Sequence, residues 1–378
     1  MAEGTSTAQA RVNRWQTMLS GTGLHEVGGA ALRRSGPVNL LSGVWLHAAA
    51  RAEQGLELTE LERSLLAPLS KVLGEEEVHA IGRVHREQQA SGQAGILPQV
   101  ITSRSLKEGF DFQDYRAALT GLLPQITGAP NVSLADPAAL SAGEGVTDPG
   151  FAAAVGEYGY GLTAFTGGER EGGARTLSAY RARLEWDGFI CHEAVGDQGG
   201  GRDEIYWTCA SNARNYAYTT RTKETGSVTG NRQWYPIWGD HVTGSRVFFD
   251  TTLDGCGAAL ITLWEADQSN SEWYDALGRA LNDVVNTMSI PDMYLGLFPG
   301  TDLIGHMNTA LSFFATFWEA FRNKDDQVLP VGFTFGAYDL STYYGRPEGR
   351  HSISFNAQSK GMGMFTLNIR YTGDQPQM

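Results

Sequence analysis

The side chains best suited to chemistry in this chain are carboxylates gathered in two short stretches. The first stretch contains Glu193, Asp197 and Asp203, and the second contains Glu265 and Asp267. The segment Ile-Tyr-Trp-Thr-Cys, which has strand character, follows the first stretch, and a second such segment, Ala-Ala-Leu-Ile-Thr-Leu-Trp, precedes the second. Carboxylate oxygens are preferred ligands of hard cations such as Ca²⁺. If the strand ends bring these side chains together, the sequence predicts a Ca²⁺ site.

Electrostatics favours a bound cation at such a cluster. Carboxylates crowded together repel one another, so one or more must take up a proton unless a cation neutralises them. The glycines at 199–201 let the backbone bend and offer carbonyl oxygens as further ligands. Asp275 is a weaker addition, because it falls where a helical pattern begins. The alternative is that both stretches are solvated loops in which Asp203 and Glu204 cap a strand end or pair with Arg202, and the sequence leaves both hypotheses open.

Signals for an enzyme are weaker. The pairs His25-Glu26 and His192-Glu193 lack the histidine that follows three residues after the glutamate in zinc hydrolases. The chain has neither a Gly-x-Ser-x-Gly nucleophile elbow nor a phosphate loop ending in Lys-Ser or Lys-Thr. The sequence therefore predicts a non-enzymatic binding protein. A hydrolase with a site assembled from scattered residues stays open as an alternative.

The elements that would support this site begin with helices. Between residues 25 and 126 the apolar residues recur at helical spacing, and Thr59-Glu-Leu-Glu62 has the pattern of a capping box. Pro37 is placed to open one helix and Gly74 to end another. We expect a helical domain at 1–127, followed by a connector rich in glycine and proline at 128–173.

From about residue 177 the pattern becomes that of strands. Residues 246–253 and 365–371 alternate apolar with polar side chains, and about eight such segments can be counted. A helical insertion at 271–323 interrupts them. The predicted fold class is therefore α+β multidomain, with an N-terminal helical domain followed by an antiparallel β-sandwich at 174–378 that carries an inserted helical hairpin.

The two acidic stretches carry a resemblance to a known family. The strand start Asp203-Glu-Ile-Tyr206 and the strand end Leu263-Trp-Glu-Ala-Asp267 resemble those of C2-like calcium-binding β-sandwich modules of uncharacterised bacterial proteins. The resemblance covers residues 177–372. It implies that loops at one end of the sandwich hold Ca²⁺, with Glu193, Asp197 and Asp203 in the first loop and Glu265 and Asp267 in the second.

Charge and composition limit the partners. The net charge of −13 excludes nucleic acid as a favoured partner, because phosphate contacts dominate that affinity. Residues 303–321 are long enough to span a membrane but include His306, Asn308 and Glu319, so we expect an amphipathic helix and no transmembrane span. The first residues lack a basic segment followed by an apolar one, so the default expectation is a cytoplasmic protein, with signal-independent export left open.

The cysteines do not indicate a metal site. Cys191, Cys209 and Cys256 show no Cys-x-x-Cys spacing. Small buried apolar side chains in a reducing compartment are the simplest interpretation, and a pair between Cys191 and Cys209 stays open.

The predicted function is a calcium-binding adhesion or attachment module, as part of a bacterial effector or secreted complex. Its partner would be a protein, a membrane or a glycan, and a homo-oligomer is left open. The alternative is a structural subunit of a bacterial or phage-derived assembly, in which the acidic loops are incidental.

Overall fold

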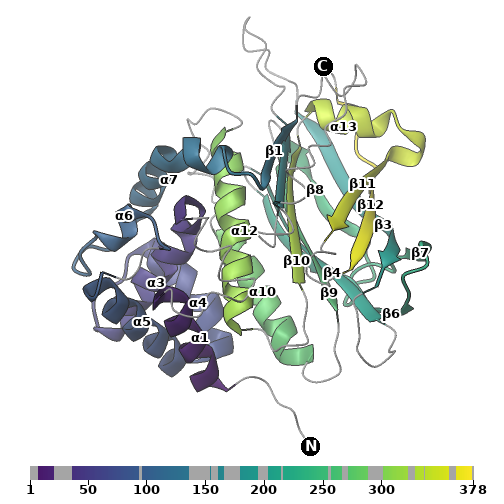
Figure 1. The fold of residues 1–378 in the computed structure, drawn as a ribbon. Coiled ribbons are helices and arrows are strands. Elements are labelled where there is room, and N and C mark those ends of the chain that lie inside the picture. Colours follow the sequence, from purple (N-terminus) through teal and green to yellow (C-terminus); the bar gives the residue numbers. More distant parts are fainter. Residues whose placement is uncertain are drawn as a thin grey trace, which may run out of the picture.

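The computed structural model describes residues 7–20, 36–92, 96–135, 154, 161–165, 179–194, 203–213, 216–253, 257–265, 271–287, 301–321, 328–335, 337–356 and 363–376. Within these ranges the protein is a mixed α+β fold in which helices come first in the sequence and mainly antiparallel sheets follow. Figure 1 shows helices packed on one face of a first sheet and a second sheet on its other face.

The first sheet, called sheet A, has seven strands in the order β1-β2-β10-β9-β4-β5, with β6 paired to β4. Its two pairs at one side, β1 with β2 and β2 with β10, are parallel, and the other pairs are antiparallel. The strands are β1 Val132–Ala135, β2 Gly161–Phe165, β4 Asp203–Ala213, β5 Tyr216–Arg221, β6 Thr225–Val228, β9 Gly257–Glu265 and β10 Val328–Phe335.

The second sheet, called sheet B, has five strands in the order β11-β12-β3-β7, with β8 also paired to β3. All its pairs are antiparallel. The strands are β3 Tyr180–Glu193, β7 Gln233–Pro236, β8 Val247–Leu253, β11 Arg350–Asn356 and β12 Met364–Tyr371.

The inner faces of the two sheets enclose an apolar core. Alternation on β12 sends Phe365, Leu367 and Ile369 into this core, as the period-two sequence pattern predicts. Cys191 of sheet B and Cys209 of sheet A are buried in the same core, and both are free, so no disulfide joins them. Burial raises the pKa of the Cys191 thiol to about 12 and that of Cys209 well above its usual range, so both stay neutral.

Helices form the third layer. They are α1 Ala8–Ser20, the 3₁₀ turn η1 Gly36–Asn39, α3 Leu40–Glu53, α4 Glu60–Leu73, α5 Glu75–Ala90, α6 Gln99–Thr102, α7 Phe112–Thr127, α10 Ser271–Thr287 and α12 Thr301–Phe321. A further helix, α13 Ala337–Tyr344, and the turn η2 Pro347–Gly349 lie at the edge of sheet B. None of the described helices is both long and apolar enough to cross a membrane.

The helical layer and sheet A share one core. Its buried side chains run from Trp15 of α1 through the helices to Tyr206 and Trp264 of sheet A. The N-terminal helices also bond directly to α12: the Tyr115 hydroxyl lies 3.0 Å from Oγ1 of Thr309 in a buried contact. Helices α10 and α12 are thus packed between the N-terminal helices and the sheet.

Local signals in the sequence correspond closely to the helices that form. The predicted capping box is present, because Thr59 Oγ1 accepts the Glu62 amide while the Glu62 carboxylate accepts the Thr59 amide. Gly74, expected to end this helix, has φ of 85°. Strands β1 and β2 come from residues 128–173, which the sequence predicts as a connector.

Strand β10 is absent from the sequence prediction. It lies in the interior of sheet A, between β2 and β9, although it contains Pro330 and Gly332, two residues disfavoured inside a strand. A Cβ on residue 332 would lie 2.8 Å from Leu311 Cδ1 of α12. The glycine therefore makes room for the helix that covers this part of the sheet.

Candidate functional site

The predicted acidic residues fall at the ends of three strands. Glu193 is the last residue of β3, Asp203 is the first of β4 and Glu265 is the last of β9. Because β4 and β9 are antiparallel, with Ile205 opposite Glu265, Asp203 and Glu265 lie at the same end of sheet A.

Two of these side chains face the space between the sheets. Ile205 and Leu263 are inter-sheet core residues, and Asp203 and Glu265 each lie two positions farther along the same strands, on the same face. Asp203 is only 2% exposed, whereas Glu265 is partly exposed. Both carboxylates therefore lie where the inter-sheet core reaches the end of the sandwich.

Glu193 approaches the same region from sheet B. Its negative charge and that of Asp203 both contribute, after burial, to the raised pKa of the Cys191 thiol. Two glycines hold the end of β3: a Cβ on Gly230 would lie 3.1 Å from Glu193 Cα, and one on Gly363 would lie 2.6 Å from the Glu193 carbonyl oxygen. Close packing of backbone thus fixes where β3 ends.

The remaining predicted ligands, Asp197 and Asp267, lie outside the described residues, as does the 199–201 glycine run. Among the residues that the structure describes, no group of three or more histidine, cysteine, aspartate or glutamate side chains is arranged to hold a metal ion. The described part of the site consists of strand ends that deliver Glu193, Asp203 and Glu265 to one end of the sandwich.

The two sequence motifs also contact each other through their aromatic residues. Tyr206 lies opposite Trp264 in the β4–β9 ladder, and their rings stack with centroids 5.7 Å apart and planes 7° apart. The Arg221 guanidinium lies 4.1 Å from the centroid of the Tyr206 ring, and the Trp264 indole N–H donates to Thr208 Oγ1 at 2.8 Å. These aromatic positions therefore serve packing between sheet A and the helices.

An open groove of about 510 Å³ lies on the helical layer, beside η1, α6 and α7. None of its lining residues carries an ionisable side chain. They are Gly36, Pro37, Leu97, Pro98, Gln99, Val100, Ala117, Ala118, Gly121, Leu122 and Gln125. The groove therefore offers neither a general base nor a charged nucleophile.

The chain matches no family model, no curated protein and no solved structure.

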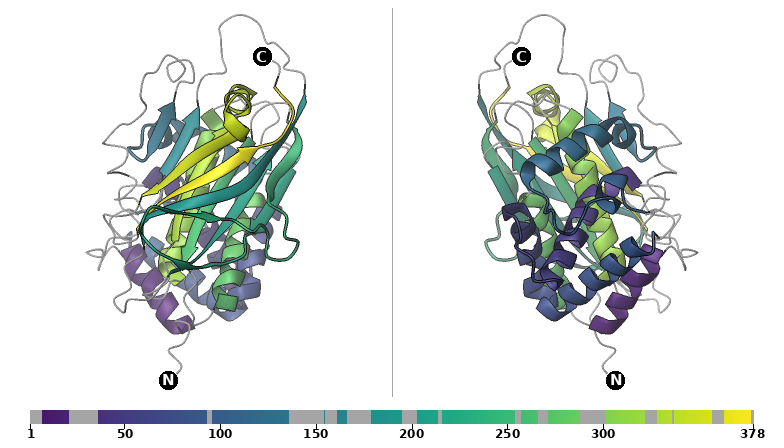
Figure 2. Two further views of the ribbon diagram at one scale, coloured as in Figure 1. Left: turned by 90° about the vertical axis from the view of Figure 1, so that its right-hand side faces the viewer. Right: turned by 90° about the vertical axis from the view of Figure 1, so that its left-hand side faces the viewer.

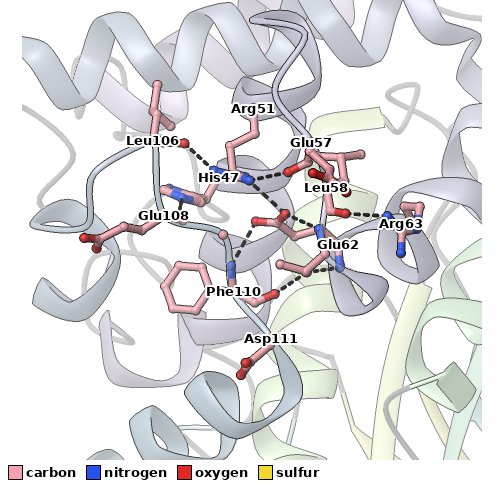
Figure 3. Close-up of polar contacts among 12 residues, drawn as sticks. His47, Arg51, Glu57, Leu58, Glu62, Arg63, Leu106, Glu108, Phe110 and Asp111 are labelled. Atoms are coloured by element: carbon pink, nitrogen blue, oxygen red, sulfur yellow. Dashed lines mark hydrogen bonds and ion pairs between the residues drawn. The ribbon is translucent and has the colours of Figure 1, made fainter.

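The helical layer contains a buried polar cluster that the sequence does not predict (Figure 3). The Arg51 side chain of α3 is buried and its Nε lies 3.1 Å from Glu62 Oε2 of α4. The remaining guanidinium nitrogens donate to the carbonyl oxygens of Leu106 and Glu57. Glu62 Oε1 accepts the Phe110 amide at 3.0 Å. The cluster therefore ties residues 106–110 to two helices.

Two histidines lie beside this cluster. His47 Nε2 lies 2.9 Å from the Glu108 carbonyl oxygen, and the ring of His85 lies 6.5 Å from that of His47. Burial lowers the pKa of His85 to about 3, with a further lowering from His47. At neutral pH His85 is therefore uncharged. The only sequence signal for this cluster is the Thr59-Glu62 capping box, which does not reveal that Glu62 has a second partner.

Proposed function

We propose that this protein is a non-enzymatic attachment module of C2-like type that binds Ca²⁺ at the end of its two-sheet sandwich. The ligands would be Glu193, Asp203 and Glu265 together with Asp197 and Asp267. The bound ion would organise the loops through which the module attaches to its partner. This proposal retains the bacterial effector or secreted-complex setting expected from the resemblance.

The observation that carries the proposal is the register of β4 and β9. It brings Asp203 and Glu265 to one end and one face of sheet A, and Glu193 reaches the same end from sheet B. Ca²⁺ accepts six to eight oxygen ligands in a flexible geometry, so ligands drawn from loops on two sheets suit it better than they suit Mg²⁺.

Thermal unfolding in Ca²⁺ against EGTA tests the proposal. A ligand that binds only the folded state stabilises it by about 2.7 kcal/mol at a hundredfold excess over its Kd, so the melting temperature should rise with Ca²⁺ concentration. Asp203→Asn should abolish most of this rise. Asp250→Asn should keep it, because Asp250 pairs with Arg181 in the middle of β8, away from these strand ends.

Two results would contradict the proposal. One is a melting temperature that is the same in millimolar Ca²⁺ and in EGTA. The other is a Ca²⁺ response retained in full by both Asp203→Asn and Glu265→Gln. Equal stabilisation by Mg²⁺ would contradict the assignment of the ion.

A further inference from the structure

None of the described helices covers the middle of the outer face of sheet B. Figure 2 (left) shows this face toward the viewer, with α13 at its upper edge. On β12 the side chains of Phe365, Leu367 and Ile369 point into the core. The intervening Thr366, Asn368 and Arg370 therefore project outward. The opposite face of the sandwich is covered by α10 and α12, so the two sheets differ in access to solvent.

An exposed tryptophan rests on this face. Trp234 of β7 lies opposite Ile190 of β3, and its indole packs against the backbone of Gly188. A Cβ on residue 188 would lie 2.7 Å from the indole carbons, so only glycine leaves room for the ring in this position. The side chain is nonetheless 48% exposed. The ring is therefore positioned by the sheet and still open to a ligand.

Hydrogen-bonding groups continue from this ring across the sheet. Gly188 lies opposite Asn368 of β12, which lies opposite Ser352 of β11. Ser352 Oγ donates to Asn368 Oδ1 at 2.7 Å, and the Asn368 amide nitrogen has no partner among the described residues. These residues form a row that runs from Trp234 over Gly188 to Asn368 and Ser352. Neighbouring strands are about 4.8 Å apart, so the two polar side chains follow the ring at successive strand spacings beyond Gly188.

A second pair lies beside the row. His192 Nε2 of β3 lies 2.8 Å from Thr366 Oγ1 of β12. The other ring nitrogen of His192 has no partner among the described residues. Donor and acceptor groups thus lie on both sides of Asn368 along the face.

The arginines of this face are paired with carboxylates. Asp187 accepts Arg350 at 2.7 Å and Arg370 at 2.8 Å, and both arginines also contact Glu348. Farther along β3 the same pattern joins Arg181 and Arg183 to Asp250 and Glu185. The four arginines and four carboxylates of these ion pairs sum to zero, and Asp374, which also interacts with Arg181, adds one more carboxylate. The face therefore matches an uncharged polar ligand better than a polyanion or an anionic membrane.

We propose that the outer face of sheet B binds a neutral glycan, with Trp234 as the stacking residue and Asn368, Ser352 and His192 as hydrogen-bonding partners. The C–H face of a sugar ring packs on the electron-rich face of an indole, and the hydroxyls around its rim bond to amide, hydroxyl and imidazole groups. None of the proposed Ca²⁺ ligands belongs to this row, so the site does not depend on the calcium proposal.

Native electrophoresis in gels that contain dextran, mannan, xylan or laminarin tests the site. The wild-type protein should be retarded by at least one of these polysaccharides, in EGTA as well as in Ca²⁺. Trp234→Ala should weaken that affinity roughly tenfold or more, the loss typical of a central aromatic anchor. Asn368→Ala should weaken it less. Tyr344→Ala is the matched control, since Tyr344 of α13 is also 48% exposed but lies outside the row.

Thermal melting of each variant checks that it is folded; Trp234 is half exposed, so its replacement should leave the fold intact. The proposal is overturned if none of the four polysaccharides retards the wild-type protein, or if Trp234→Ala is retarded as strongly as wild type. Retardation only by a polyanion such as heparin, or retardation lost in EGTA, would also overturn it. Retardation only by a polyanion would indicate a charged partner. Retardation lost in EGTA would indicate binding at the acidic end of the sandwich. A melting temperature that does not change with Ca²⁺ would contradict the calcium proposal but not the glycan proposal.

Discussion

At the scale of single residues, the helical layer depends on polar side chains that are fully withdrawn from water. A buried charge is costly unless it is paired and its remaining hydrogen bonds are made. Glu62 meets both conditions, because it accepts the Arg51 guanidinium and the amides of Thr59 and Phe110. The Glu62 side chain thereby caps the N-terminus of α4 and also binds the segment that contains Phe110.

We predict that Glu62→Gln destabilises the protein by about 3–5 kcal/mol, because it leaves the Arg51 charge buried without a counter-charge. Urea unfolding followed by circular dichroism measures this loss. The control is Arg83→Ala, which removes an exposed partner of Glu53 and should cost less than about 1 kcal/mol. A Glu62→Gln loss as small as the control would show that the buried pair contributes little.

At the scale of elements, the crossing of α3 and α5 is set by one glycine. Every residue of α3 from Leu40 to Arg51 is buried, so this helix is surrounded by the others. A Cβ on Gly82 of α5 would lie 2.3 Å from the Ala49 carbonyl oxygen of α3. The two backbones are therefore too close for any side chain at position 82.

We predict that Gly82→Ala destabilises the protein by about 1–3 kcal/mol or more, because the two helices must separate. Gly121→Ala is the matched substitution in α7, where a Cβ meets nothing within 4 Å. It should stabilise by about 0.5–1 kcal/mol, since alanine favours a helix over glycine. Midpoints of urea unfolding compare the two variants, and equal effects of the two substitutions would contradict the close crossing.

At the scale of the whole molecule, the helices and sheet A are joined by a continuous core. Trp264 of β9 packs edge to face on Phe314 of α12, and Phe317 of α12 in turn contacts Trp15 and Trp45 of the N-terminal helices. Removing the N-terminal helices would expose the far side of α12. Apolar surface of that extent opposes independent folding of the remainder.

We predict one cooperative unfolding transition for the full chain, with circular dichroism and tryptophan fluorescence giving the same midpoint. A fragment of residues 128–378 should fail to melt cooperatively. Two separate transitions, or a stable fragment, would instead favour the independent N-terminal domain at 1–127 that the sequence predicts.

Much of the local structure could be read from short-range patterns. The capping box at Thr59 and the alternation at 365–371 depend on neighbours within one turn or one strand, and both form as predicted. Strand β10 could not be predicted in this way, because Gly332 is there to accommodate Leu311 from a distant helix. The acidic motifs were recognisable, whereas the stacking of Tyr206 on Trp264 required the strand register.

The sequence by itself determined the N-terminal helices, most strands after residue 177 and which carboxylates stand at strand ends, because capping, periodicity and residue type act over a few neighbouring positions. Only the tertiary structure decided that β4 and β9 pair so that Asp203 and Glu265 share an end and a face, and that Trp234 lies over Gly188 on the outer face of sheet B. Such contacts join residues far apart in the chain, and their geometry follows from strand register and from how the layers pack.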